Sequence, residues 1–161
     1  MTSEQLIKPA PIVKRVEVNA PVERAFEVFT AGIGSWWPKQ MTILKSPQKA
    51  MIIEPRVGGR WYEVGEDGSE CDTGRVRVWE APNRVVLVWQ LTAQWAYDPD
   101  FETEVEVRFI PEGDRTIVEL EHRDLERFGD RAVEVRGGYD SGMEGGWGEL
   151  LVGYQRTAES S

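Results

Sequence analysis

Cysteine and histidine are scarce in this sequence of 161 residues, which contains one of each, Cys71 and His122. A single cysteine cannot form an intramolecular disulfide, and its scarcity is typical of a reducing compartment. Zinc sites usually draw several ligands from cysteine and histidine, and an iron site of the two-histidine, one-carboxylate type needs two histidines. We therefore expect the protein to use no metal and no cofactor.

Long apolar runs and positive charge are scarce as well. The longest purely apolar run, Val85 to Trp89, is far shorter than the roughly 20 residues that cross a bilayer. Residues 1–11 contain no apolar core of the kind found in signal peptides. The net charge of -9 argues against nucleic acid and against anionic membranes as partners, because both bind basic surfaces. Together these absences predict a cytoplasmic protein.

Alternating apolar and polar residues predict seven strands. They cover residues 12–19, 51–54, 60–65, 73–80, 84–92, 102–110 and 116–123. Tight turns between neighbours favour an antiparallel sheet. In the fourth strand, the alternation places Val76 and Val78 on one face and Arg75, Arg77 and Trp79 on the other.

Helical periodicity occurs on both sides of the strands. Pro21 suits the first turn of a helix that Gly32 and Gly34 end, and a short helix or turn follows at residues 35–38. A C-terminal helix is predicted from an apolar stripe made of Met143, Trp147, Leu150, Leu151 and Tyr154. We expect an α+β fold over residues 12–157 as a single domain, preceded by an N-terminal arm at residues 1–11. A curved seven-stranded antiparallel sheet would wrap around the C-terminal helix, with two short helices after the first strand.

Several motifs follow one another in an order that resembles a known family. They are Ala20-Pro21-Val22-Glu23-Arg24-Ala25-Phe26, Trp36-Trp37-Pro38, the segment from Glu54 to Glu63, the segment from Trp79 to Arg84, Glu121-His122-Arg123 and Gly145-Gly146-Trp147. The sequence resembles the heat-shock-protein-90 ATPase activator-like family, which belongs to the SRPBCC superfamily of START-related and birch-pollen-allergen-like proteins. This resemblance implies the helix-grip fold, in which a cavity commonly lies between the sheet and the long helix.

The resemblance also implies a second function, that of a co-chaperone-like domain acting on a heat-shock chaperone through an acidic surface. The eukaryotic co-chaperones of the family carry an additional N-terminal domain that stimulates the chaperone. Nothing in this sequence corresponds to that domain. We therefore expect the chain not to stimulate a chaperone ATPase.

Large aromatic side chains and a few polar ones are the candidate ligand-binding residues. They are Trp36, Trp61, Glu63, Trp89, His122, Met143 and Trp147. Trp61, Trp89 and Trp147 would meet between sheet and helix, where they would either line a pocket or simply fill the core. Strand parity turns His122 inward, either as a structural hydrogen-bonding residue or as a ligand contact. Glu63 shares the parity of Trp61, so it either faces the cavity or lies solvated at a rim.

The residues leave three functions open. The first is a binding domain with an internal cavity for a small apolar or aromatic ligand, and the second is the co-chaperone-like domain. The third is an enzyme that performs acid–base chemistry through Glu63 or His122. No nucleophilic triad, metal cluster or phosphate-binding loop is recognisable in the sequence. Cys71 is expected to be an inert thiol. The sequence therefore assigns no catalytic residue, and it indicates neither an oligomeric state nor a particular ligand.

Overall fold

The computed structural model describes residues 9–137, 139 and 146–160, so the predicted contact residue Met143 lies outside the described residues. The elements follow one another along the chain as β1 (Ile12–Val18), α1 (Val22–Phe29), α2 (Ile33–Trp36), β2 (Gln48–Ile53), β3 (Arg60–Gly65), β4 (Glu70–Glu80), β5 (Arg84–Trp89), β6 (Thr103–Glu112), β7 (Arg115–Arg123), the 3-10 segment η1 (Leu125–Arg131), α3 (Ala132–Gly137) and α4 (Trp147–Glu159).

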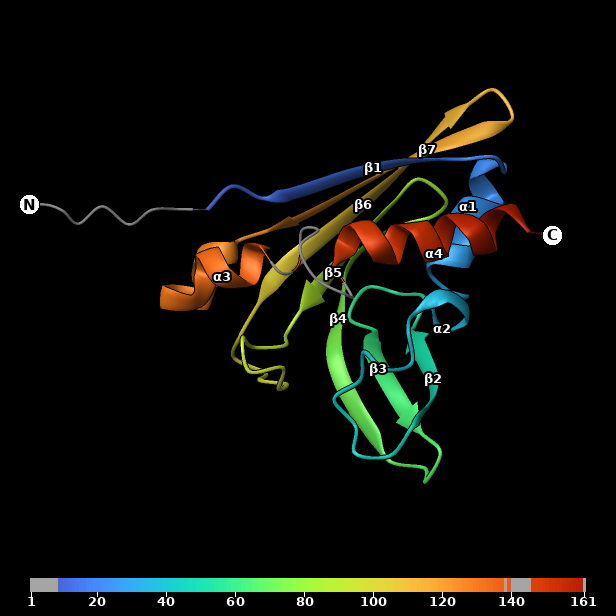
Figure 1. Cartoon of the computed structure of the whole chain (residues 1–161). Coiled ribbons are helices and arrows are strands. Elements are labelled where there is room, and N and C mark those ends of the chain that lie inside the picture. Colours follow the sequence, from blue (N-terminus) through green and yellow to red (C-terminus); the bar gives the residue numbers. More distant parts are fainter. Residues whose placement is uncertain (1–8, 138, 140–145, 161) are drawn as a thin grey trace, which may run out of the picture.

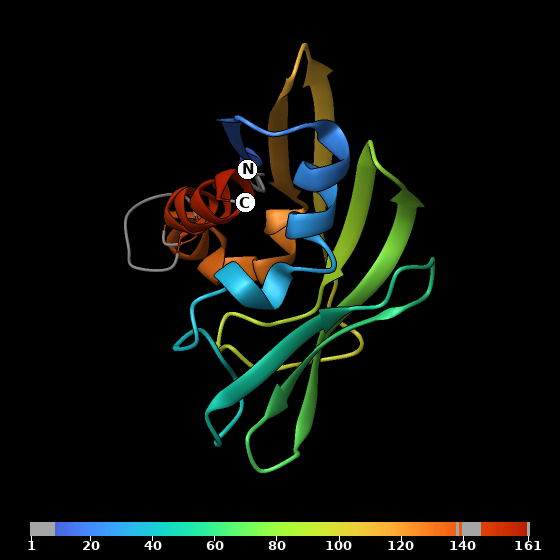
Figure 2. The same ribbon diagram turned by 90° about the vertical axis from the view of Figure 1, so that its right-hand side faces the viewer.

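The seven strands form one antiparallel sheet in the order β1-β7-β6-β5-β4-β3-β2. The sheet curls around α4, as Figure 1 shows, and the predicted helix-grip α+β fold is confirmed. In the view of Figure 2, α1, α2 and α4 all lie on the same side of the sheet. Among the described residues, no helix is long and apolar enough to cross a membrane.

Strand alternation produces the buried face. On β6, Val105, Val107 and Phe109 are at most 1% exposed and face the helices. The helices supply matching apolar stripes, which consist of Ala25, Phe26, Val28 and Phe29 on α1 and Trp147, Leu150, Leu151, Tyr154 and Ala158 on α4. These stripes form one continuous core with the inner face of the sheet.

The alternation predicted for β4 is wrong at Trp79. The pairing register with β5 shifts between Val76 and Val78, which marks a β-bulge. A bulge inserts one extra residue and reverses the parity of the residues that follow it. Trp79 therefore turns inward, where its ring meets Phe26 on α1 edge-to-face at 5.1 Å.

Charged residues on the outer face of the sheet are largely paired with one another. Glu106 accepts hydrogen bonds from Arg84 and from Arg123, both at 2.6 Å. Burial alone would raise the pKa of Glu106, but these hydrogen bonds outweigh it and the pKa is lowered. This network links β5, β6 and β7 on the outer face of the sheet, and its charges are paired with one another.

Candidate functional site

Five rings meet between the sheet and α4, and we call them the aromatic centre: Trp37, Trp61, Trp89, His122 and Trp147. The Trp61 ring lies 5.7 Å from Trp89 and 6.1 Å from Trp37, and the Trp89 ring lies 5.9 Å from Trp147 and 5.3 Å from His122. The tryptophan pairs are edge-to-face, which is a favoured geometry for aromatic rings. Each tryptophan of this set is at most 3% exposed. The predicted meeting of Trp61, Trp89 and Trp147 is confirmed.

Gly74 explains how two of these rings can touch across an intervening strand. It lies on β4, directly opposite Trp61 on β3 and directly opposite Trp89 on β5. A Cβ at this position would lie 1.7 Å from the carbonyl oxygen of Val88 and 3.4 Å from Cε3 of Trp61. The missing side chain therefore permits both the close strand approach and the contact between the two indoles.

His122 is fixed in one tautomer by its neighbours. The indole N–H of Trp147 donates to Nδ1 of His122 at 3.0 Å, and an indole can only donate, so Nδ1 carries no proton. Nε2 of the neutral ring therefore carries the proton and donates to Thr103 Oγ1 at 2.8 Å. The Thr103 hydroxyl in turn donates to the Trp89 carbonyl at 3.4 Å. Both ring nitrogens are thus used within the protein.

Burial lowers the pKa of His122 from 6.5 to about 3. We expect the ring signals of this single histidine to show no titration between pH 8 and pH 4.5 in the folded protein, as measured by NMR. Unfolded protein in urea is the control and should titrate near its ordinary value of about 6.5. A titration midpoint between pH 6 and 7 in the folded protein would contradict the geometry.

The lowered pKa of His122 also determines how the stability of the protein depends on pH. Between about pH 6.5 and pH 3, the unfolded chain binds a proton at His122 that the folded chain does not bind. The free energy of unfolding therefore falls as the pH falls through this window, by up to about 1.4 kcal/mol per pH unit. Above pH 6.5 the histidine contributes no pH dependence.

Glu63 lies inside the fold and is 1% exposed, so the interpretation of a solvated rim carboxylate is wrong. Its oxygens accept hydrogen bonds from the Thr42 hydroxyl, from the Ile43 N–H at 3.2 Å and from Gln48 Nε2 at 2.9 Å. These contacts tie the segment between α2 and β2 to the sheet. A buried carboxylate needs such donors, because its desolvation is otherwise costly.

Trp36 lies beside the aromatic centre. Its indole N–H donates to the Val28 carbonyl at 2.8 Å, and its ring lies 5.1 Å from Phe29 and 5.4 Å from Tyr154. Among the described rings of the aromatic centre, the one that Trp36 contacts is Trp37, at 6.0 Å. Trp37 is the member of this pair that contacts Trp61 and Trp147. It is not among the predicted site residues.

Two further rings extend the aromatic centre outward, and neither was predicted. Trp95 lies 5.8 Å from Trp89, and Tyr139 stacks on His122 at 5.7 Å with an interplanar angle of 20°. Both are partly exposed, and burial raises the pKa of the Tyr139 hydroxyl. Trp95 has a positive φ of 62°, an unfavourable conformation for a bulky residue and one that often marks a functional position. Its loop has no periodicity, so only its composition could have drawn attention to it.

Cys71 lies opposite Glu63 in the sheet. Burial raises the pKa of the thiol, and the negative charges of Glu63 and Asp72 raise it further. A thiol kept protonated in this way is a poor nucleophile. Within the described part of the chain, no group of three or more histidine, cysteine, aspartate or glutamate residues could hold a metal ion.

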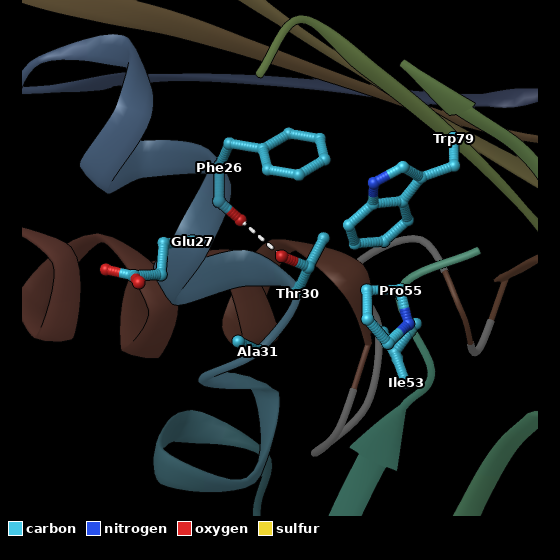
Figure 3. A pocket seen from close by; sticks show the side chains of 7 residues that line it. All are labelled: Phe26, Glu27, Thr30, Ala31, Ile53, Pro55 and Trp79. Carbon is cyan, nitrogen blue, oxygen red and sulfur yellow. Dashed lines mark hydrogen bonds between the residues drawn. The ribbon is translucent and has the colours of Figure 1, made fainter. Parts of the chain in front are cut away.

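A separate open pocket of ≈ 300 Å³ lies between α1, the end of β2 and β4. Figure 3 shows its lining residues, which are Phe26, Glu27, Thr30, Ala31, Ile53, Pro55 and Trp79. The Thr30 hydroxyl donates to the Phe26 carbonyl at 2.8 Å, so this polar group is already used, and the Glu27 carboxylate points away from Trp79 in this view. The pocket is therefore mainly apolar, and none of the predicted site residues that the structure describes lines it.

The comparisons with known proteins agree with this architecture. The family model described as Activator of Hsp90 ATPase homolog 1-like protein matches residues 19–157, and the chain belongs to this family. No curated protein matches the chain. Among solved structures, an anthrahydroquino-γ-pyrone synthase, Txn09, complexed with SUM, is 36% identical with a TM-score of 0.64, and the match covers 92% of this chain and 97% of that one.

Two other solved structures show how far the likeness extends. The self-sacrificing resistance protein CalC from Micromonospora echinospora is 32% identical, with a TM-score of 0.69 and coverage of 92% of this chain and 94% of that one. The Aha1 dimer from Colwellia psychrerythraea is 15% identical, with a TM-score of 0.62 and coverage of 94% and 98%. At that identity, the Aha1 structure supports the fold alone.

Proposed function

We propose that this protein binds a small, mainly apolar aromatic molecule at the aromatic centre. The observation that carries the proposal is the continuity of the rings from the interior to the surface. Trp61, Trp89 and Trp147 are buried, while Trp95 and Tyr139 continue the same set of ring contacts to partly exposed positions. A core that only stabilised the fold would not need a partly exposed tryptophan in a left-handed conformation at its edge.

The backbone of Trp95 supports the role of an entrance residue. A residue held in a sparsely populated conformation costs about 1–3 kcal/mol and persists only when its surroundings enforce it. Here the left-handed backbone places the Trp95 ring 5.8 Å from Trp89 and 6.2 Å from Tyr139. Displacement of this ring would uncover Trp89, so a ligand could exchange one set of aromatic contacts for another.

The relatives support a small-molecule function. Of the two solved structures described above at more than 30% identity, one is a synthase complexed with SUM, and its name denotes an anthrahydroquinone joined to a γ-pyrone, which is a flat polycyclic system. The other is a self-sacrificing resistance protein. Large flat molecules suit a site whose walls are indole rings.

The surroundings of His122 and Glu63, the two residues considered for acid–base catalysis, favour binding over catalysis. Both nitrogens of His122 are engaged with Trp147 and Thr103, and burial keeps the ring neutral. Glu63 accepts three hydrogen bonds from the protein. A general base must reach the proton that it removes, but both nitrogens of His122 are occupied and both side-chain oxygens of Glu63 already accept hydrogen bonds from the protein.

The test is a fluorescence titration with N-phenyl-1-naphthylamine, a neutral aromatic probe. We expect saturable one-to-one binding with quenching of tryptophan emission. Trp95→Ala should weaken binding about tenfold, because an aromatic pair contributes about 0.5–1.5 kcal/mol beyond its buried area. Thermal unfolding of the variant shows whether it remains folded.

The matched control is Trp79→Ala, which removes a partly buried tryptophan from the pocket of Figure 3. It should leave the dissociation constant unchanged. If Trp79→Ala abolished binding and Trp95→Ala did not, the ligand would bind in that pocket and the proposed site would be wrong. The absence of saturable binding across a panel of neutral aromatic probes would overturn the function itself.

A further inference from the structure

Three buried polar atoms on strands β2, β3 and β4 have no hydrogen-bond partner among the described residues. They are the indole N–H of Trp61, the side-chain oxygen Oε1 of Gln48 and the hydroxyl of Thr73. These residues are 0%, 3% and 1% exposed, respectively. Most buried polar groups in proteins are hydrogen-bonded, and an unsatisfied one destabilises the folded state. Three of them on adjacent strands need an explanation.

The unpartnered N–H of Trp61 is an exception within this protein. Four other buried tryptophans donate their indole N–H to an acceptor at 2.8–3.1 Å: Trp36 to the Val28 carbonyl, Trp37 to the Met41 carbonyl, Trp89 to the Leu91 carbonyl and Trp147 to His122. The fold thus satisfies indole donors elsewhere. At Trp61, in the middle of the aromatic centre, it leaves the donor open.

The three atoms belong to one region of the sheet. Trp61 on β3 lies opposite Ile53 on β2 and opposite Gly74 on β4. Thr73 directly precedes Gly74 and is the additional residue at the point where the β3–β4 register shifts. Gln48 lies on β2 and is linked to β3 by its bond to Glu63, two residues from Trp61. We call these three residues the polar edge of the aromatic centre.

The chemistry of each atom defines what it lacks. An indole N–H can only donate, so Trp61 needs an acceptor. The Gln48 amide donates through Nε2 to the Glu63 carboxylate, which can only accept, so the orientation of the amide is settled and its Oε1 needs a donor. The Thr73 hydroxyl can serve either role. A complementary molecule therefore presents both an acceptor and a donor.

Charge further restricts the chemical class of the ligand. Glu63 is a buried carboxylate beside Gln48, so an anionic ligand would meet like charge there. An ammonium group offers no acceptor for the Trp61 N–H. A neutral ligand satisfies both conditions, and a carbonyl together with a hydroxyl supplies the required acceptor and donor.

We infer that the polar edge selects neutral aromatic ligands that carry a ketone-type oxygen, which accepts from Trp61, and a hydroxyl group, which binds Gln48 or Thr73. The inference rests on the proposed function and goes beyond it by naming the polar chemistry of the ligand. A purely hydrocarbon ligand would fill the aromatic centre but would leave the polar edge unsatisfied.

The experiment compares three probes that share a ring system: 2-ethylnaphthalene, 2-acetylnaphthalene and 6-hydroxy-2-acetylnaphthalene. Trp61→Phe keeps an aromatic ring and removes the N–H. It should weaken the binding of 2-acetylnaphthalene about tenfold relative to its effect on 2-ethylnaphthalene, because one buried hydrogen bond of about 1–1.5 kcal/mol is lost only for the ketone. Trp79→Phe is the matched control outside the site and should not discriminate between the two probes.

Thr73→Val provides a second, nearly isosteric variant. It should weaken binding of the hydroxylated ketone more than binding of the plain ketone. It should also leave the melting temperature of the free protein unchanged or raised, because it removes an unpaired buried hydroxyl. A lowered melting temperature would show that the hydroxyl is already satisfied within the protein and would overturn its role at the polar edge.

The outcomes separate the inference from the function on which it rests. If Trp61→Phe weakens ethyl and acetyl probes equally, the aromatic centre binds ligands but the polar edge does not select them, and the inference is wrong. If the wild-type protein binds none of the three probes, the proposed function fails as well. If Trp61→Phe weakens the binding of the ketone probe selectively, the result supports both the inference and the proposed function.

Discussion

Trp147→Ala should lower the free energy of unfolding by about 3–5 kcal/mol, because it removes a large buried ring and leaves a cavity. Trp147 is the first residue of α4 and 3% exposed, and its ring contacts Trp37, Trp89 and His122. It also donates the hydrogen bond that fixes the tautomer of His122. Denaturant unfolding followed by far-UV circular dichroism measures the loss.

His122→Ala is compared with Trp147→Ala to distinguish the contributions of the two residues to stability and to binding. It should cost less, about 1–2 kcal/mol, mainly because it leaves the Trp147 N–H and the Thr103 hydroxyl short of a partner. Probe binding is measured on both variants at temperatures where each is folded. If His122→Ala destabilised the protein as strongly as Trp147→Ala without altering binding, His122 would be a structural residue of the core and its place in the site would be wrong.

Gly74→Ala should be the most damaging of the small substitutions, with a loss of about 3 kcal/mol or more, because the clash is with backbone and no side-chain rotation relieves it. The added Cβ would lie 1.7 Å from the Val88 carbonyl oxygen. The strand pair must move apart, and the contact between Trp61 and Trp89 across Gly74 should loosen. Denaturant unfolding measures the loss, and near-UV circular dichroism reports the tryptophan environment.

Gly137→Ala is the matched control at the end of α3, where an added Cβ meets nothing within 4 Å. It should be neutral or stabilise the protein slightly, since alanine favours a helix by about 0.5–1 kcal/mol over glycine. Similar effects of the two substitutions would show that Gly74 is not a close-approach position and would remove the explanation offered for the contact between the two indoles.

Much of the fold could be predicted because its strands have one buried face and tight turns. Regular alternation places Val105, Val107 and Phe109 correctly, and β3 begins and ends where the sequence pattern does. The error at Trp79 arose at a bulge, where one additional residue reverses the parity. Bulges depend on the pairing of two strands, so a single strand's pattern does not reveal them.

The buried part of the site could be predicted from the alternation of strand residues, but its outer part could not. Trp61, Trp89 and His122 lie on strands whose inward positions can be counted. Trp95 lies in a loop, and its position depends on a left-handed backbone and on contacts with residues distant in sequence. The polar edge was equally hidden, because an unsatisfied atom can be recognised only once all of its neighbours are known.

The most direct test of the central claim uses the indole N–H signals of the seven tryptophans in a 15N-labelled sample. Addition of 2-acetylnaphthalene should shift the signals of Trp61, Trp89 and Trp95 along one saturable curve and leave Trp79 in place. The largest shift should be that of Trp61, because its N–H gains an acceptor. If the ligand at saturation shifts Trp79 and leaves Trp61 unchanged, or shifts none of the seven signals, the aromatic centre is not a binding site and its rings serve only to stabilise the fold.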